Sequence, residues 1–164
     1  MSILSKLTGT WDCTYWTETN TNDPSDVIHT YSKDVKGVLM YTSDGYMSAM
    51  MQHPDVPSYT LGFLQGTDGE HIEAASKTHG YNGSFTVQEP AEAGKSLVIE
   101  HHVLMGLPTN LAGKTQRRFA EITEEAGQLY LTIRADFAIN RDRVDRNIEV
   151  GWKKREPISP IKAS

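Results

Sequence analysis

The sequence has very little cysteine, with Cys13 alone among 164 residues. A single cysteine cannot form an internal disulfide, and it excludes a metal site built on several thiolates. Long apolar runs are also missing, because no segment approaches the roughly 18 consecutive apolar residues of a membrane-spanning helix. The N-terminal residues likewise lack the apolar stretch of a signal peptide. We therefore expect a cytoplasmic protein in a reducing environment, with no membrane partner.

Positive charge is scarce as well. The chain has 16 Lys and Arg residues against 21 Asp and Glu residues, which gives a formal net charge of -5. The basic clusters, Arg117-Arg118 and 153–155, are expected at solvated strand positions. A protein that binds nucleic acid needs a basic face for the phosphates. The composition therefore argues against a nucleic-acid partner.

What the sequence does contain is short, alternating segments separated by turns. Strand-forming residues flank Ser43-Asp44-Gly45 within 35–52, and Asp-Gly between alternating segments is a strong hairpin signal. The other segments predicted as strands are 8–17, 81–88, 96–104, 114–122, 128–134 and 147–154. The pattern predicts one all-β domain over 1–156, a closed antiparallel up-and-down barrel, with a flexible C-terminal tail over 157–164.

One short helix is predicted between the strands. Thr67 and Glu70 form a capping box, in which the threonine oxygen and the glutamate side chain satisfy each other's backbone N–H groups. The helix is expected to run to about Lys77, with Gly80 ending it. A single helix among barrel strands is expected to cover one open end of the barrel.

Alternation along the strands assigns side chains to the barrel interior. In the first strand Trp11, Cys13 and Tyr15 share one face, and Trp16 lies on the other. The residues expected to contact a ligand in a central cavity are Tyr15, Leu39, Met47, Met51, Tyr81, Phe85 and Phe119. The two methionines suit a bulky and variable apolar ligand, although ordinary core filling explains them nearly as well.

Four pieces of the chain resemble a known family. Gly9-Thr10-Trp11 is similar to the Gly-x-Trp of lipocalins, and 37–51 resembles the hairpin of the lipocalin-like domain family. His101-His102-Val103, followed by Gln116 and Arg118, and the closing segment 150–154 are similar to later motifs of that family. Departures lie in the loop 108–112, which lacks the family's tryptophan, and in a shortened segment before the helix.

This resemblance spans about 7–155 and implies a closed barrel with a central pocket. Some relatives look like cofactor-free cyclases or isomerases of polyketide or terpenoid pathways, and others only bind. Fold alone does not decide between these activities.

The paired histidines are the first candidates for chemistry. Neighbours on a strand point to opposite faces, so His101 and His102 cannot hold one metal ion together, and we expect no metal site. We expect His101 to face inward with Ile99 and Val103, although a bulge would reverse this assignment. An inward histidine can act as a general acid or base, or it can simply bond a neighbouring side chain and shape the pocket.

Arg118 and Tyr41 complete the predicted catalytic set. Arg118 can hold a ligand carboxylate or enolate, or, as the resemblance implies, stack on the indole of Trp11 and close the barrel floor. Tyr41 can donate a proton to a developing enolate, or it can be a packing residue with one satisfied hydroxyl.

Three functions follow from these residues. The first is a cofactor-free isomerase or cyclase that acts on an apolar, oxygenated small molecule, and the second is a non-catalytic carrier of a hydrophobic metabolite. The third is a filled barrel whose outer face, with Trp16 and Tyr46, binds another protein. We favour the enzyme, because a histidine and several tyrosines exceed what carriage requires. No cofactor is expected. The sequence does not decide the oligomeric state, and a homodimer is one of the alternatives.

Overall fold

The computed structural model describes residues 2–62, 65–90 and 96–158. Nine strands occur in this part of the chain: β1 (Gly9–Asn20), β2 (Val27–His29), β3 (Lys36–Tyr41), β4 (Tyr46–Gln52), β5 (Thr78–Gln88), β6 (Leu97–Leu107), β7 (Thr115–Glu125), β8 (Gln128–Arg141) and β9 (Val144–Lys154). The helices are α1 (Ile3–Leu7), α2 (Asp68–Ser76) and the 3-10 helix η1 (Thr109–Leu111). Most of the predicted tail, 159–164, lies outside the described residues.

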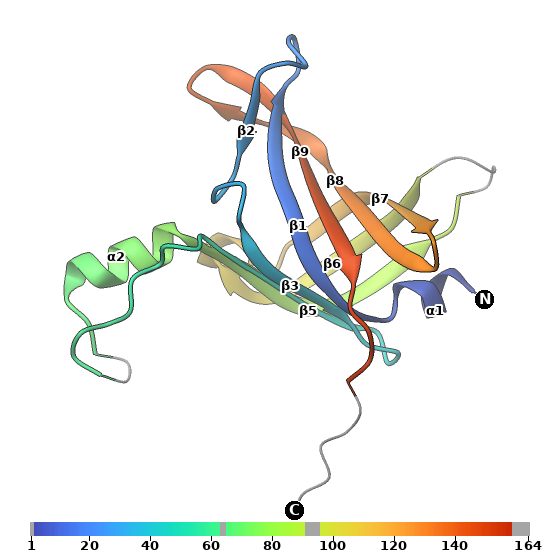
Figure 1. The fold of residues 1–164 in the computed structure, drawn as a ribbon, viewed down its shortest axis with the longest axis horizontal. Coiled ribbons are helices and arrows are strands. Elements are labelled where there is room, and N and C mark those ends of the chain that lie inside the picture. The colour runs from blue at the N-terminus through green and yellow to red at the C-terminus, as the bar shows by residue number, and fades with distance from the viewer. Residues whose placement is uncertain (1, 63–64, 91–95, 159–164) are drawn as a thin grey trace, which may run out of the picture.

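The sheet closes on itself (Figure 1). Strands β3 to β9 pair antiparallel in chain order, and β1 pairs with β3 on one side and β9 on the other. Eight strands therefore form the barrel. Strand β2 pairs only with β1, near the C-terminal end of β1. The prediction of a closed antiparallel barrel is confirmed.

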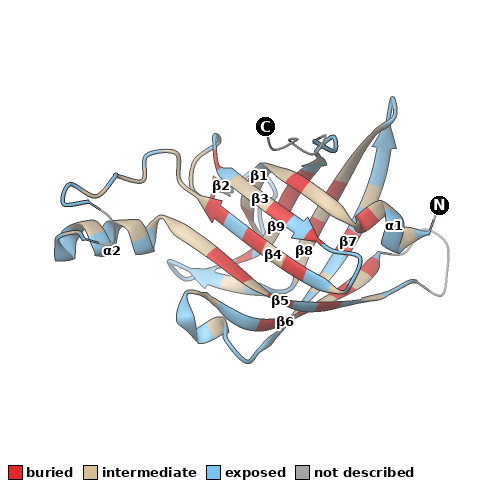
Figure 2. Cartoon of the chain, turned by 90° about the horizontal axis from the view of Figure 1, so that it is seen from below, coloured by how far each residue is buried: buried red, intermediate tan, exposed pale blue. Residues whose placement is uncertain are grey.

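One end of the barrel is closed by α1, at the opposite end of the molecule from α2 (Figure 2). Leu7 of this helix and Trp11 of β1 have no exposed surface. The Trp11 indole Nε1 donates a hydrogen bond to the Leu7 carbonyl at 2.8 Å, which ties the helix to the strand. Helix α1 is not predicted by the sequence pattern, because five residues are too few to show a helical period.

Helix α2 begins as predicted but lies elsewhere than expected. Thr67 is its N-cap, and both halves of the capping box with Glu70 are present. The helix ends at Ser76, and Gly80 belongs to β5, so the prediction that Gly80 ends the helix is wrong. None of its residues is buried, and it projects from the barrel in Figure 1 rather than covering an opening. Its one large apolar residue, Ile72, cannot form the apolar stripe that docking would require.

A bulge in β1 reverses the predicted faces. The pairing with β9 shifts between Cys13 and Tyr15, so that Trp16, not Tyr15, turns into the barrel. Tyr15 packs instead over Gly151 on the outer face and donates a hydrogen bond to Glu149 Oε1 at 2.7 Å. The inward assignment of Tyr15 and the outward assignment of Trp16 are both wrong. An exposed patch formed by Trp16 and Tyr46 is therefore also excluded.

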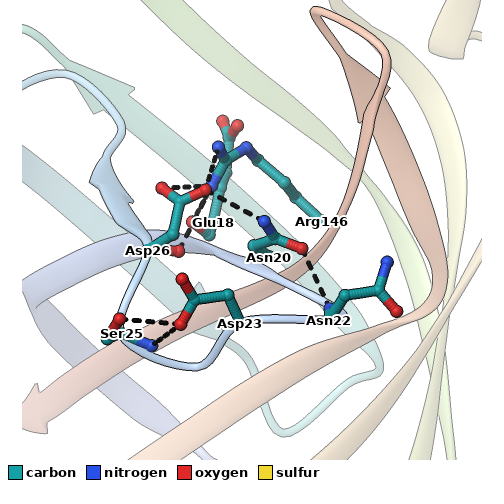
Figure 3. Close-up of polar contacts among 7 residues, drawn as sticks. All are labelled: Glu18, Asn20, Asn22, Asp23, Ser25, Asp26 and Arg146. Atoms are coloured by element: carbon teal, nitrogen blue, oxygen red, sulfur yellow. Dashed lines mark hydrogen bonds and ion pairs between the residues drawn. The ribbon is translucent and has the colours of Figure 1, made fainter.

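A polar network joins the turn between β1 and β2 to strand β9 of the barrel (Figure 3). Arg146 of β9, only 6% exposed, donates to both carboxylate oxygens of Asp26 at 3.1 and 2.8 Å. Asn20 adds a third bond to Asp26 at 3.0 Å. These bonds lower the pKa of Asp26, because each of them stabilises its ionised form. The turn between β1 and β2 is thus held in place by side-chain hydrogen bonds.

A second bulge brings two backbones unusually close. Between β5 and β6 the pairing shifts at Gly83, where an added Cβ would lie 2.0 Å from the His102 carbonyl oxygen. We expect Gly83→Ala to lower the free energy of unfolding by about 2 kcal/mol, because the strands must move apart. Urea unfolding followed by circular dichroism measures this loss. Ser84→Ala on the exposed face is the control, and equal effects of the two changes would contradict the argument.

Candidate functional site

A central cavity of about 100 Å³ lies inside the barrel, and all eight barrel strands contribute to its wall. Its lining residues are Trp16, Leu39, Ala49, Met51, His79, Tyr81, His101, Arg118, Ile133, Ala135, Ile148, Val150 and Trp152. Most of these side chains are apolar, and the polar ones come from β1, β5, β6, β7 and β9. The wall thus combines an apolar surface with a few hydrogen-bonding groups, as in small-molecule sites.

The predicted site residues divide into three groups. Leu39, Met51, Tyr81, His101 and Arg118 line the cavity. Three others, Tyr41, Met47 and Phe85, are buried in the core but are not part of the cavity wall. Tyr15 lies on the outer face, as described above.

Phe119 also lies outside the barrel. It is 37% exposed, and the Arg117 guanidinium lies 5.8 Å from its ring centroid. Alternation along β7 explains this placement, because Arg118 and Ala120 turn inward and leave Phe119 on the opposite face. The inward assignment of Phe119 is therefore wrong.

His101 faces inward as predicted and is bonded by two tyrosines. Its side chain is 2% exposed, with Nε2 2.7 Å from the Tyr41 hydroxyl and Nδ1 2.9 Å from the Tyr81 hydroxyl. Both ring nitrogens are occupied, so His101 has no free nitrogen for a ligand. Any action of His101 on a bound molecule must pass through Tyr81, which lines the cavity.

The direction of these bonds follows from their surroundings. Tyr41 is 1% exposed, and within the described residues its hydroxyl has no hydrogen-bond partner other than His101. A buried hydroxyl must place its proton on an acceptor, so Tyr41 donates to Nε2. The Nδ1–H of His101 then donates to Tyr81, which leaves the Tyr81 proton free to point into the cavity.

The pKa values keep the three hydrogen-bonded side chains of Tyr41, His101 and Tyr81 uncharged at neutral pH. Burial lowers the pKa of His101 to about 3, with smaller effects of the same sign from Arg118 and His102. Burial also raises the pKa of Tyr41 and of Tyr81, although the charge of Arg118 partly opposes both shifts. Tyr81 therefore remains protonated and offers a hydrogen-bond donor to the cavity.

His79 lines the cavity but was not predicted from the sequence to do so. Its ring lies edge-on to Trp16 and Tyr81, at centroid distances of 5.3 and 5.9 Å. Burial, together with the charge of Arg118, lowers its pKa to about 4, so the ring is neutral at neutral pH and has one unprotonated nitrogen. Alternation back from Tyr81 would have identified it, but the predicted strand began at residue 81 and β5 begins at Thr78.

Arg118 lines the cavity and does not stack on Trp11. The cation over the Trp11 ring is Lys154, whose Nζ lies 5.2 Å from the ring centroid. The Arg118 guanidinium lies 5.9 Å from the Phe137 ring and donates to the Arg117 carbonyl and Gln116 Oε1. The expectation that Arg118 closes the barrel floor on Trp11 is therefore wrong, while its role toward a ligand stays a prediction.

Two tryptophans of the cavity wall also carry polar groups, their indole N–H donors. The indole Nε1 atoms of Trp16 and Trp152 are buried, and neither has a hydrogen-bond partner among the described residues. Trp152 itself is 3% exposed. Buried donors of this kind nearly always have an acceptor in folded proteins, so these two require an explanation.

Within residues 2–62, 65–90 and 96–158, no three His, Cys, Asp or Glu side chains lie where they could hold a metal ion. None of the described helices is long and apolar enough to cross a membrane. His102 faces outward, with Nδ1 3.0 Å from Thr115 Oγ1.

Comparison with known proteins supports the assignment from the fold. A family model described as Lipocalin-like domain matches residues 8–155, which is most of the chain. A search of curated proteins finds no match. A closed barrel around a mostly apolar cavity is consistent with the binding of a small hydrophobic ligand. The chain belongs to the lipocalin-like domain family.

Proposed function

We propose that the protein binds an apolar, oxygenated small molecule in the barrel cavity and catalyses its cofactor-free isomerisation or cyclisation. The observation that carries this proposal is the chain of hydrogen bonds from Tyr41 through His101 to Tyr81. It presents one oriented hydroxyl donor to a mostly apolar space. A fixed donor of this kind stabilises negative charge that develops on a carbonyl oxygen.

The size of the cavity limits what can enter. A volume of about 100 Å³ is smaller than most ligand pockets and close to the roughly 150 Å³ cavity that holds benzene. One ring, or the carbonyl-bearing end of a longer molecule, fills such a space. A polyketide or terpenoid precursor would therefore place only its reacting part inside the barrel.

The reaction is a proton transfer between two carbon atoms of the substrate. Tyr81 donates a hydrogen bond to the substrate carbonyl, and His79 removes a proton from the adjacent carbon. The C–H electron pair moves into the new carbon–carbon double bond, and the former carbonyl oxygen gains the negative charge. In a β,γ-unsaturated ketone, return of the proton from His79 to the γ-carbon moves the C=C bond into conjugation and restores the carbonyl, which completes an isomerisation. In a cyclisation, the enolate carbon attacks a second carbonyl carbon of the same molecule, the first carbonyl is restored, and the new alkoxide takes the proton from His79.

A carrier without catalysis is the second candidate. The mostly apolar wall favours it, because binding of a hydrophobic metabolite needs only shape and apolar surface. The two candidates differ in one property, which is whether a bound ketone exchanges protons faster than it does in water.

Deuterium exchange of cyclohexanone measures this property directly. In D₂O, the wild-type protein is expected to accelerate loss of the α-proton signals in the NMR spectrum, and Tyr81→Phe is expected to slow the catalysed rate about 100-fold. Tyr46→Phe, on the exposed outer face, is the control that keeps the full rate. Binding of the ketone without accelerated exchange would leave the carrier as the function and reject the enzyme.

A further inference from the structure

We infer that the ligand of the cavity carries a carboxylate, which Arg118 and the indole N–H groups of Trp16 and Trp152 hold. This inference rests on the proposed binding function, and it names the chemical class of the bound molecule. It does not depend on whether the molecule also reacts.

The unpartnered indoles are the first argument. Trp16 and Trp152 both line the cavity, and each buries an N–H donor with no acceptor among the described residues. Trp11, the third tryptophan, shows the contrast, because its N–H is satisfied by the Leu7 carbonyl at 2.8 Å. The two donors without partners among the described residues thus belong to the two tryptophans that line the cavity. An acceptor on the ligand would remove the cost of leaving them unbonded.

The arrangement of the strands brings these donors to one side of the cavity. Trp16 pairs with Val150 across β1 and β9, and Trp152 is the next inward residue along β9. Arg118 stands two strands away, since β7 pairs with β8 and β8 with β9. Arg118, Trp152 and Trp16 therefore lie on β7, β9 and β1, which belong to one side of the barrel wall with β8 between the first two.

The charge of the wall is the second argument. Arg118 is the one ionised side chain of the cavity lining, which contains no Asp or Glu. Its hydrogen-bond acceptors include the neutral Arg117 carbonyl and the Gln116 amide oxygen. Within the described ranges, no carboxylate lies within ion-pair distance of its guanidinium. The positive charge also lowers the pKa of His79 and His101, so its field extends across the cavity.

Together these features favour an anion over a neutral carbonyl. A single planar cation with two N–H donors suits the two oxygens of a carboxylate, which accept bonds from several directions. The apolar remainder of the wall suits a hydrocarbon body of about one ring. The small volume disfavours a bulkier anion such as a phosphate ester.

Titration of the protein, with ¹⁵N-labelled indoles, by benzoate and by its neutral isostere benzamide tests the inference. We expect benzoate to shift the N–H signals of Trp16 and Trp152 downfield in a saturable manner and to leave Trp11 unmoved. Its Kd should be about tenfold lower than that of benzamide. The single variants Trp16→Phe and Trp152→Phe assign the signals.

Arg118→Gln and Arg117→Gln form a matched pair of variants on opposite faces of β7. We expect Arg118→Gln to weaken benzoate binding about tenfold and benzamide binding little, while Arg117→Gln changes neither. Equal binding of benzoate and benzamide would overturn the carboxylate inference and leave the proposed binding of a neutral molecule intact. No shift of either indole with either compound would reject both.

Discussion

Lowering the pH from 7 to 5 is expected to reduce the free energy of unfolding by about 4 kcal/mol through two buried histidines alone. His79 and His101 have pKa values of about 4 and about 3 in the folded protein, because burial disfavours their charged forms. An unfolded histidine has a pKa of about 6.5. At pH 5 the unfolded chain therefore carries nearly two protons on these histidines that the folded chain does not.

The sign of the effect follows from proton linkage. Stability falls wherever the unfolded state binds more protons, so the contribution is fully present above about pH 6.5. It is lost progressively as the pH falls from there toward the folded pKa values of about 4 and about 3. Each histidine accounts for about 2 kcal/mol of the difference between pH 7 and pH 5.

Urea unfolding at both pH values, followed by circular dichroism, measures the difference. His101→Gln keeps a hydrogen-bonding side chain but removes one titrating group, and it should reduce the difference by about 2 kcal/mol. His29→Gln, on the exposed strand β2, is the control and should leave the difference unchanged. If the wild type and His101→Gln lost the same stability between pH 7 and pH 5, the buried neutral histidine would not be the cause.

The barrel could be predicted from the sequence because its signals are local. The Asp44-Gly45 turn, the alternating segments and the capping box at Thr67 each act over a few residues, and each appears in the structure. Strand β8 runs seven residues beyond its predicted end at Arg134, where polar side chains hide the alternation. Short α1 gave no periodic signal at all.

The cavity could be predicted only in part, because side-chain direction depends on strand register. His101 was placed correctly, since β6 alternates without interruption from Leu97 to Val103. One extra residue in β1 turned Trp16 inward and Tyr15 outward, and no single sequence marks such a bulge. The same bulge places in the cavity wall the indole of Trp16, whose N–H has no partner among the described residues. The feature that the sequence did not predict is therefore part of the candidate site.

Trp11→Ala is expected to lower the free energy of unfolding by about 4 kcal/mol, the largest single loss in the barrel. The indole has no exposed surface and fills the closed end beneath α1. Its N–H holds the Leu7 carbonyl, and the Lys154 ammonium lies over its ring while bonding the Lys6 carbonyl. Removal of the ring therefore creates a cavity, breaks the hydrogen bond to Leu7 and removes the ring that lies beneath the Lys154 ammonium.

Comparison with Trp11→Phe separates the two contributions. Phenylalanine keeps most of the apolar volume but cannot donate to Leu7, so we expect it to cost about 1 to 2 kcal/mol. Urea unfolding must be followed by far-ultraviolet circular dichroism, because the substitution removes one fluorophore. A loss in Trp11→Ala no greater than in Trp11→Phe would show that the hydrogen bond to α1, and not the packing of the ring, closes this end of the barrel. Since Trp11 is not part of the cavity wall, neither change should alter benzoate binding in molecules that remain folded.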